Sequence, residues 1–463
     1  MADARRNPQM MSNRAAASEN RFRFREANAL RAKAEELGLD LPWSDDVASL
    51  LEPTRVGDVT LPNRLAVQPM EACDAEPDGS PGAHTLRRYT RYAAGGAGLI
   101  WFEATAVLPE GRANPRQLYL HEGNAAEFTR LVRATRQAAH DAHGDDHEPL
   151  LILQLTHSGR WSKPSGTRQP VIAHHNPDLD RLVGVNAHYP VITDDELEAL
   201  ESTMLAAARL AARAGFDGVD VKSCHGYLAS ELLAARTRPG RFGGSLLHRM
   251  RFLLDTIRSI REEVPTSLVT SRINAYDGLP HPFGFGADEA DSSRADLTEP
   301  LALLREMEES GCPLGNVSIG VPYWRPHLGR PFDRPVPGSA PSPEHPLVGV
   351  VRLLRIVGEL QLALPQLPLV GTGYSWLRHH FPNVGAGAVE RGEVSLVGVG
   401  RMAFAYPDFA CDLREKGGLD YLKSCCACSG CTQLLRSGDE AGCVVRDRGL
   451  YRLPRKPRAA PAP

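Results

Sequence analysis

One short stretch in the middle of the chain combines residue types that can donate hydrogen bonds and protons. The stretch VKSCHGYLASELL, residues 221–233, places Lys222, His225 and Tyr227 directly after a run of strand-forming residues. A tyrosine has an unperturbed pKa of about 10, so its hydroxyl is protonated at neutral pH and can serve as a general acid. Histidine and lysine can both donate to an oxygen that gains negative charge during a reaction. The stretch is therefore a candidate catalytic segment, although a single His or Tyr at a strand end also fits a structural role.

A second candidate site lies near the end of the chain, where five of the nine cysteines are found within forty residues. Four of them have the spacing C-x2-C-x2-C-x11-C: Cys425, Cys428, Cys431 and Cys443. Thiolates at these intervals suit an iron–sulfur cluster or tetrahedral zinc. Free or disulfide-bonded thiols are the third alternative. The clustering argues against a disulfide scaffold for the whole protein.

The elements that must hold these residues alternate along the chain. Eight runs rich in Val, Ile and Leu recur, at residues 64–69, 98–104, 150–155, 216–221, 267–273, 316–321, 367–371 and 394–400. Helical patterns separate them, and one of these begins at a capping box of Thr193 and Glu196 and ends at Gly215. Strands without polar alternation are buried on both faces, as in a parallel sheet covered by helices. The pattern predicts an α/β protein, a (β/α)8 TIM barrel.

Three parts of the chain are expected. Residues 1–50 form an N-terminal arm, disordered over residues 1–17 and helical from about Ser18 to Gly38. Residues 51–416 form the barrel, and residues 417–463 form a Cys-rich C-terminal extension. Within the barrel, the Pro- and Gly-rich stretch 277–346 is expected to be long loop that contains one helix, at about 297–310, and the sixth strand. Long loops at strand ends commonly carry substrate specificity.

Polar residues and glycines at the strand ends predict a cofactor site, because chemistry in such barrels lies at the carboxyl ends of the strands. Gln154 and Arg272, on the third and fifth runs, can hydrogen-bond a heterocycle that carries carbonyl groups. Glycine turns follow the seventh and eighth runs, and Arg401 adjoins the second of them, an arrangement that holds phosphate in many barrels. The stretch GTGYSW lacks the third glycine of a dinucleotide fingerprint. A flat, phosphorylated cofactor is expected.

The motifs LPNRLAVQPM, LQLTHSGR, GFDGVDVKSCHGYLASELL, RFGGSLLHRMRF and VGVGRMAFAYPDF resemble, in this order, the old yellow enzyme family of FMN-dependent barrels over residues 52–416. The resemblance implies FMN as cofactor. The flavin contacts that it implies are Pro69, Met70, Ala104, Gln154 and Arg272, with the phosphate near Gly371, Gly373, Gly400 and Arg401. It further implies that Lys222 and His225 bind the substrate carbonyl and that Tyr227 donates the proton.

The function implied is an ene-reductase type of oxidoreductase, which transfers a hydride between reduced flavin and an α,β-unsaturated carbonyl or a related cyclic substrate. Two departures from the family pattern leave an alternative open. Lys222 replaces an imidazole or amide and could instead pair with Glu103 or Asp220, and Glu71 replaces a short or sulfur-containing side chain. The alternative is a dehydrogenase or demethylase, or a flavin-binding barrel without catalysis.

The cysteine spacing also resembles that of larger relatives such as 2,4-dienoyl-CoA reductase, which carry a four-iron cluster just after the barrel with the spacing C-x2-C-x3-C-x11-C. That resemblance implies a [4Fe-4S] cluster on the four cysteines, and the cluster would receive electrons from an external carrier. If the motif instead began at Cys428 and Cys431, its third ligand position would be Leu435 and no cluster would form.

Composition excludes several other classes of protein. The 463 residues are 42% hydrophobic and 24% charged, with a net charge of −3 and no long run of one sign, so neither nucleic acid nor a membrane surface is an expected partner. No apolar stretch is long enough to span a membrane, and the start lacks the apolar centre of a secretory signal. We expect a cytoplasmic protein whose partners are a small-molecule substrate and NAD(P)H or an electron carrier. The N-terminal arm would suit a homo-oligomer.

Overall fold

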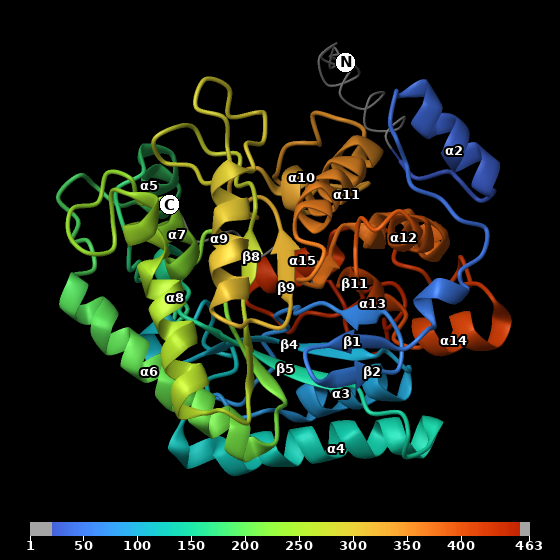
Figure 1. Ribbon diagram of the computed structural model, residues 1–463, viewed down its shortest axis with the longest axis horizontal. Helices are drawn as coiled ribbons and strands as arrows, with labels where there is room; N and C mark the ends of the chain where they lie inside the picture. Colours follow the sequence, from blue (N-terminus) through green and yellow to red (C-terminus); the bar gives the residue numbers. More distant parts are fainter. Residues whose placement is uncertain (1–20, 454–463) are drawn as a thin grey trace, which may run out of the picture.

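The chain folds into a barrel of parallel strands surrounded by helices (Figure 1). The computed structural model describes residues 21–453, and within them the main sheet has nine strands in the order β7-β6-β5-β4-β3-β11-β10-β9-β8. All neighbouring strands in that order are parallel. The strands are β3 Leu65–Val67, β4 Leu99–Ala106, β5 Leu150–Thr156, β6 Gly218–Val221, β7 Leu268–Thr270, β8 Arg272–Asn274, β9 Gly315–Ser318, β10 Leu369–Gly371 and β11 Leu396–Val399.

The two ends of this sheet are joined by the chain itself, which closes the barrel. Strands β7 and β8 are separated by Ser271 alone, and β7 pairs with β6 while β8 pairs with β9. The Ser271 hydroxyl donates to the carbonyl of Val221 at 2.7 Å, so the break is tied to the neighbouring strand. The predicted strand 267–273 is therefore one barrel strand in two pieces. The predicted (β/α)8 barrel is confirmed.

Helices follow the strands in turn and cover the outside of the barrel (Figure 1). They are α3 Ala83–Ala94, α4 Ala125–His143, α6 Asp194–Ala214, α8 Leu246–Glu263, α9 Thr298–Glu309, α11 Pro346–Ala363, α12 Phe381–Glu390 and α14 Phe409–Lys416. Helix α6 has the predicted capping box, because Thr193 Oγ1 accepts from the backbone of Glu196 at 3.2 Å and the Glu196 carboxylate accepts from the backbone of Thr193 at 2.7 Å. It ends at Gly215, whose φ of 95° favours glycine.

The amino-terminal end of the barrel is closed by a hairpin that the sequence patterns did not predict. Strands β1 Thr54–Val56 and β2 Val59–Leu61 are antiparallel. Val56 and Leu61 are fully buried and pack in one cluster with residues at the beginning of the barrel strands, including Leu99 and Leu150. Burial of this apolar surface stabilises the closed end, and the opposite end is left for the chemistry.

The N-terminal arm contains helix α2 Ala27–Glu36, which is shorter than the predicted helix from 18 to 38. The rings of Phe22 and Phe24 precede it in non-helical backbone and lie 5.1 Å and 6.3 Å from the ring of Trp376. Packing of these aromatic rings thus overrides helical propensity at the beginning of the arm. The disorder predicted for residues 1–17 lies outside the described residues.

The stretch 277–346 has the predicted helix α9 and also a short helix, α10 Pro326–Gly329, that was not predicted. No helix among residues 21–453 is long and apolar enough to cross a membrane.

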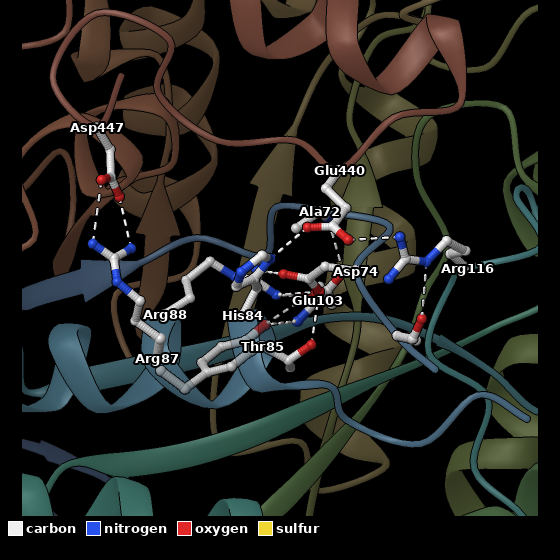
Figure 2. A network of polar contacts seen from close by, with 12 residues as sticks. Ala72, Asp74, His84, Thr85, Arg87, Arg88, Glu103, Arg116, Glu440 and Asp447 are labelled. Carbon is white, nitrogen blue, oxygen red and sulfur yellow. Dashed lines mark hydrogen bonds and ion pairs between the residues drawn. The ribbon is translucent and has the colours of Figure 1, made fainter. Parts of the chain in front are cut away.

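The C-terminal extension returns across the barrel and is fastened to it by ion pairs (Figure 2). Its helix α15 Gly430–Ser437 is followed by Asp447, which pairs with Arg87 of α3 at 2.7 Å, and by Glu440, which pairs with Arg116 at 2.6 Å. The backbone N–H of Ala441 donates to the carbonyl of Ala72 at 2.7 Å. The extension therefore lies against the segment that follows β3. The division of the chain at residues 50 and 416 stays a prediction.

Candidate active site

The predicted site residues lie at or just beyond the carboxyl ends of the barrel strands. Met70 and Glu71 follow β3, Lys222 follows β6, and Arg272 is the first residue of β8. Pro69 also follows β3, Ala104 and Gln154 lie within β4 and β5, Gly371 ends β10, Gly373 follows it, and Gly400 with Arg401 follows β11. Because the strands are parallel and the barrel is closed, these segments meet at one end of the molecule.

Glu71, Lys222 and Tyr227 form a compact cluster. Lys222 Nζ lies 2.9 Å from Oε1 of Glu71, and the Tyr227 hydroxyl donates to the same oxygen at 2.9 Å. Lys222 Nζ also lies 3.6 Å from the centroid of the Tyr227 ring. The side chains of Lys222 and Glu71 are 3% and 13% exposed, so the charge of each is balanced mainly by the other. The alternative pairing of Lys222 with Glu103 or Asp220 is wrong, because those carboxylates are held by other partners.

Those other partners are specific. Glu103 accepts from Arg88 and from the backbone of Ala72, and Figure 2 shows this buried network below the C-terminal extension. Asp220 accepts from Gln154 Nε2 at 2.6 Å and from the backbone N–H of Arg272 at 2.7 Å. Asp220 thereby holds Gln154 and Arg272, two predicted flavin contacts, in place. The sequence did not predict this role.

The Tyr227 hydroxyl is kept protonated by its surroundings. Burial raises the pKa of Tyr227 well above its ordinary value, and the negative charge of Glu71 raises it further. The hydroxyl of Tyr323, in the loop after β9, lies beside that of Tyr227. The phenol is therefore protonated at neutral pH, and its proton is directed at the Glu71 carboxylate.

His225 adopts a backbone conformation that is uncommon for its residue type. Its φ is 65°, in the left-handed region, and the next residue, Gly226, has a φ of 71°. The ring is half-buried, and its Nε2 lies 3.1 Å from the hydroxyl of Ser318 at the end of β9. Burial lowers the pKa of His225, and the charges of Arg272 and Lys222 lower it further. A neutral imidazole therefore lies at this strand end. Strained backbone of this kind is found preferentially at functional sites.

Two buried arginines point to an anionic, heteroatom-rich ligand. Arg272 is 5% exposed and Arg401 is 7% exposed. Within residues 21–453 the Nε of Arg272 and the Nη1 of Arg401 have no hydrogen-bond partner. Burial lowers the pKa of Arg272, which reflects the unfavourable free energy of an uncompensated guanidinium. Both side chains fit the carbonyls and phosphate of FMN.

The glycine positions of the predicted phosphate site are sterically required. A Cβ on Gly400 would lie 2.8 Å from Sδ of Met70, and a Cβ on Gly371 would lie 2.9 Å from the side chain of Val394. Gly373 has a φ of 102°, which side-chain-bearing residues rarely adopt. Internal packing and backbone conformation thus require glycine at these turns, and their role as a phosphate site stays a prediction.

Comparison with known proteins identifies the family. The family model described as NADH:flavin oxidoreductase / NADH oxidase matches residues 49–295. The chain belongs to this family. Residues 49–295 include the Glu71, Lys222, Tyr227 cluster and Arg272, and the resemblance found in the sequence is confirmed.

Curated relatives of the NADH:flavin oxidoreductase family share about 30% identity with the chain. The NADH oxidase of Thermoanaerobacter brockii is 30% identical over 289 residues, which are 61% of this chain and 41% of that protein. The NADPH dehydrogenase of Clostridium acetobutylicum is 29% identical over 233 residues, 49% of this chain and 64% of that protein. The chain thus spans less than two thirds of the length of these relatives.

Solved structures with the same fold include a reductase, a dehydrogenase and an old yellow enzyme homologue. A 2-naphthoyl-CoA reductase complex has a TM-score of 0.69 at 20% identity, covering 87% of this chain and 57% of that chain. The old yellow enzyme homologue from Zymomonas mobilis has a TM-score of 0.57 at 22% identity, covering 80% and 94%. Histamine dehydrogenase from Rhizobium sp. 4-9 has a TM-score of 0.63 at 20% identity, covering 87% and 53%. At these identities the likeness concerns the fold.

The cysteines of the extension lie close to one another and to the predicted flavin site. The backbone N–H of Cys425 contacts Met402 Sδ at 3.4 Å, directly after Arg401. Burial raises the pKa of Cys425 to about 12. The neighbouring Cys431 and Cys443 also raise this pKa, because a second thiolate nearby is repelled. Backbone N–H groups contact sulfur at Cys425 and Cys443, at 3.4 Å and 3.3 Å.

In the described part of the chain, however, no three His, Cys, Asp or Glu side chains are arranged to hold a metal ion. The assignment of Cys425, Cys428, Cys431 and Cys443 as ligands stays a prediction.

Tyr323, a neighbour of the Tyr227 hydroxyl, is not among the predicted site residues. Tyr323 follows the predicted run 316–321 by two residues, in the stretch GVPYW. Its ring stacks on Trp161 with centroids 4.0 Å apart and an interplanar angle of 21°. An aromatic residue directly beyond a barrel strand was the signal that could have found it.

Proposed function

We propose that the protein is an FMN-dependent oxidoreductase of the ene-reductase type, which transfers a hydride between reduced flavin and an α,β-unsaturated carbonyl or a related cyclic substrate. One observation carries the proposal. The buried Tyr227 hydroxyl contacts the Glu71 carboxylate at 2.9 Å, at the strand ends that also carry Arg272, whose Nε has no hydrogen-bond partner among residues 21–453. Membership of the NADH:flavin oxidoreductase family supports FMN as the cofactor.

The residues that would hold FMN lie at the strand ends, and two of them, Arg272 and Arg401, have a buried nitrogen without a hydrogen-bond partner among residues 21–453. Arg272 and Gln154 would bind the ring, and Gly373, Gly400 and Arg401 would bind the phosphate. Bound FMN would supply hydride chemistry. The Asp220 carboxylate accepts hydrogen bonds from the Gln154 side chain and the Arg272 backbone. These bonds hold the proposed ring-binding residues in position before a ligand binds.

Lys222 and His225 would bind the substrate carbonyl. An ammonium has three protons, and the one contact of Lys222 with Glu71 leaves others to donate. If Nε2 of the neutral His225 accepts from Ser318, then Nδ1 carries the proton and is free to donate, since no contact of Nδ1 occurs among the described residues. Two donors aimed at a carbonyl oxygen would stabilise the negative charge that develops there.

Tyr227 would deliver the proton to the α-carbon, a neighbouring cation would stabilise the phenolate that remains, and solvent would supply the replacing proton. Proton loss from Tyr227 leaves a phenolate, which the Lys222 ammonium 3.6 Å from the ring centroid would stabilise. Glu71, hydrogen-bonded to both, keeps lysine and tyrosine in this arrangement.

We further propose that Cys425, Cys428, Cys431 and Cys443 hold an iron–sulfur cluster, with zinc as the alternative. The N–H···S contacts at Cys425 and Cys443 suit ligating thiolates. A cluster there would pass single electrons between an external carrier and the site.

The test of the main proposal is spectroscopic. The purified protein should be yellow, NAD(P)H or dithionite should bleach the flavin absorbance under anaerobic conditions, and 2-cyclohexenone should then restore it. A protein that binds flavin yet is not reoxidised by any enone would instead favour the dehydrogenase or the non-catalytic alternative.

A further inference from the structure

An aromatic pair lies next to the catalytic tyrosine and is fixed to the same loop. Trp161 stacks on Tyr323, and its indole N–H donates to the carbonyl of Gly226 at 2.8 Å, one residue before Tyr227. Trp161 is 6% exposed, whereas Tyr323 is only partly buried. Tyr323 therefore offers an aromatic surface beside the Tyr227 hydroxyl.

Two cations lie near this pair, Lys163 close to Trp161 in the sequence and Arg436 at the residue before Tyr323. Lys163 follows Trp161 by two residues, and its backbone N–H donates to the carbonyl of Arg112 at 2.8 Å. Arg436, on helix α15 of the C-terminal extension, donates to the carbonyl of Pro322, directly before Tyr323, at 3.3 Å, and to the hydroxyl of Ser339 at 3.1 Å.

The cations lack acidic partners. Lys163 Nζ makes no hydrogen bond or ion pair with any residue from 21 to 453, although the side chain is partly buried. Burial lowers the pKa of the Lys163 ammonium, and the positive charges of Arg168 and Arg436 lower it further. The contacts of Arg436 are to neutral oxygens only. Lys163 is half-buried, and a half-buried ammonium without a counter-charge is unfavourable, so binding of an anion relieves that free energy. Arg436 is exposed and adds a second positive charge beside Tyr323.

We propose that the substrate carries an anionic group, a carboxylate or a phosphate, which Lys163 and Arg436 bind while Tyr323 packs against the adjoining apolar part. This inference rests on the proposed function, because it assigns the specificity of the same site. It also gives the C-terminal extension a direct part in substrate binding, since Arg436 belongs to α15.

The inference is tested by calorimetric titration of the FMN-loaded protein with three aromatic probes: benzoate, phenyl phosphate and the uncharged benzamide. At least one anion should bind roughly tenfold or more tightly than benzamide, as expected for a charge-assisted contact. Lys163→Met and Arg436→Met should each weaken anion binding by roughly tenfold and leave benzamide binding little changed. The stronger of the two anions identifies the group as carboxylate or phosphate.

Two control variants make the result specific. Lys163→Arg keeps the charge and should retain most of the affinity, and Arg305→Gln removes an exposed cation on the outer helix α9 and should leave binding unchanged. Equal affinities for anions and benzamide, absence of anion binding, or anion binding that survives both Met substitutions would overturn the inference. Failure of the proposed function is seen separately, as flavin that 2-cyclohexenone does not reoxidise in the unmutated protein.

Discussion

Oε1 of Glu71 accepts from both the Lys222 ammonium and the Tyr227 hydroxyl, each at 2.9 Å. Glu71 and Lys222 are the two positions at which the chain departs from the old yellow enzyme pattern, and the structure pairs them with each other. The two departures compensate in charge, so they count as one coordinated change in the site and not as two independent losses.

Glu71→Gln should lower the free energy of unfolding by about 3 kcal/mol, because Lys222 would be left buried without its counter-charge. Urea denaturation of the FMN-loaded protein measures this. The double variant Glu71→Gln, Lys222→Met removes both charges and should recover much of the loss. An unchanged urea midpoint for Glu71→Gln would show that Lys222 does not depend on Glu71.

Tyr227→Phe should leave flavin reduction nearly intact and slow flavin reoxidation by an enone by about 10²- to 10⁴-fold, the effect of losing a general acid. Stopped-flow absorbance separates the two half-reactions. Tyr323→Phe is the matched control, since it removes the neighbouring hydroxyl but keeps that of Tyr227. Reoxidation of Tyr227→Phe at the unmutated rate would move proton delivery to solvent or to another residue.

Arg272→Ala and Arg401→Ala should each weaken retention of FMN, because these buried guanidiniums have groups without protein partners in the described chain. The ratio of flavin to protein after gel filtration is the measurement. Arg305→Ala, at an exposed position on α9, should retain flavin like the unmutated protein. Stoichiometric flavin in both Arg272 and Arg401 variants would contradict the assignment of these residues.

Cys431→Ser should remove iron and acid-labile sulfide from anaerobically prepared protein and leave FMN bound. Reduction by a ferredoxin-type donor should then be lost to a greater extent than reduction by dithionite. Cys411→Ser, in α14 and apart from the predicted ligands, serves as the control. Zinc without iron in the unmutated protein would make the extension a structural metal site, and no metal at all would reject both alternatives.

The stability of the protein should depend on the protonation of Glu103. Burial raises the pKa of Glu103 to about 7 from an ordinary value of 4.5, although Arg88 lowers it. Between these values the folded state binds more protons than the unfolded state, so the free energy of unfolding falls as the pH rises. The contribution is fully present below about pH 4.5, is lost through about pH 7, and amounts to at most about 3 kcal/mol.

Glu103→Gln should therefore flatten the decline in stability between about pH 5 and about pH 8, as measured by urea denaturation at several pH values. Glu359→Gln, at an exposed position on α11, is the control for loss of a carboxylate. The same slope in the Glu103 variant and the unmutated protein would assign the pH dependence to other groups.

The sequence by itself determined the barrel and the strand ends at which the predicted flavin-site residues lie. Uniformly apolar strands such as β4 and β5 indicate burial on both faces, and each strand end is marked in the sequence by where its apolar run stops. In a closed parallel barrel all of these ends meet, so residues as distant as Met70 and Gly400 become neighbours without further information. The predicted start of the helix in the arm was wrong at Phe22 and Phe24, because packing of their rings outweighs helical propensity there.

Only the tertiary structure decided which charged groups neutralise one another. Three carboxylates, those of Glu71, Glu103 and Asp220, were possible partners of Lys222. Arg88 binds Glu103 and Gln154 binds Asp220, so Lys222 pairs with Glu71. Likewise, nothing in the sequence places Arg436 of the extension beside Tyr323 of the barrel. Pairing of charges depends on side-chain directions and on the competition among several partners, which spacing along the chain does not encode.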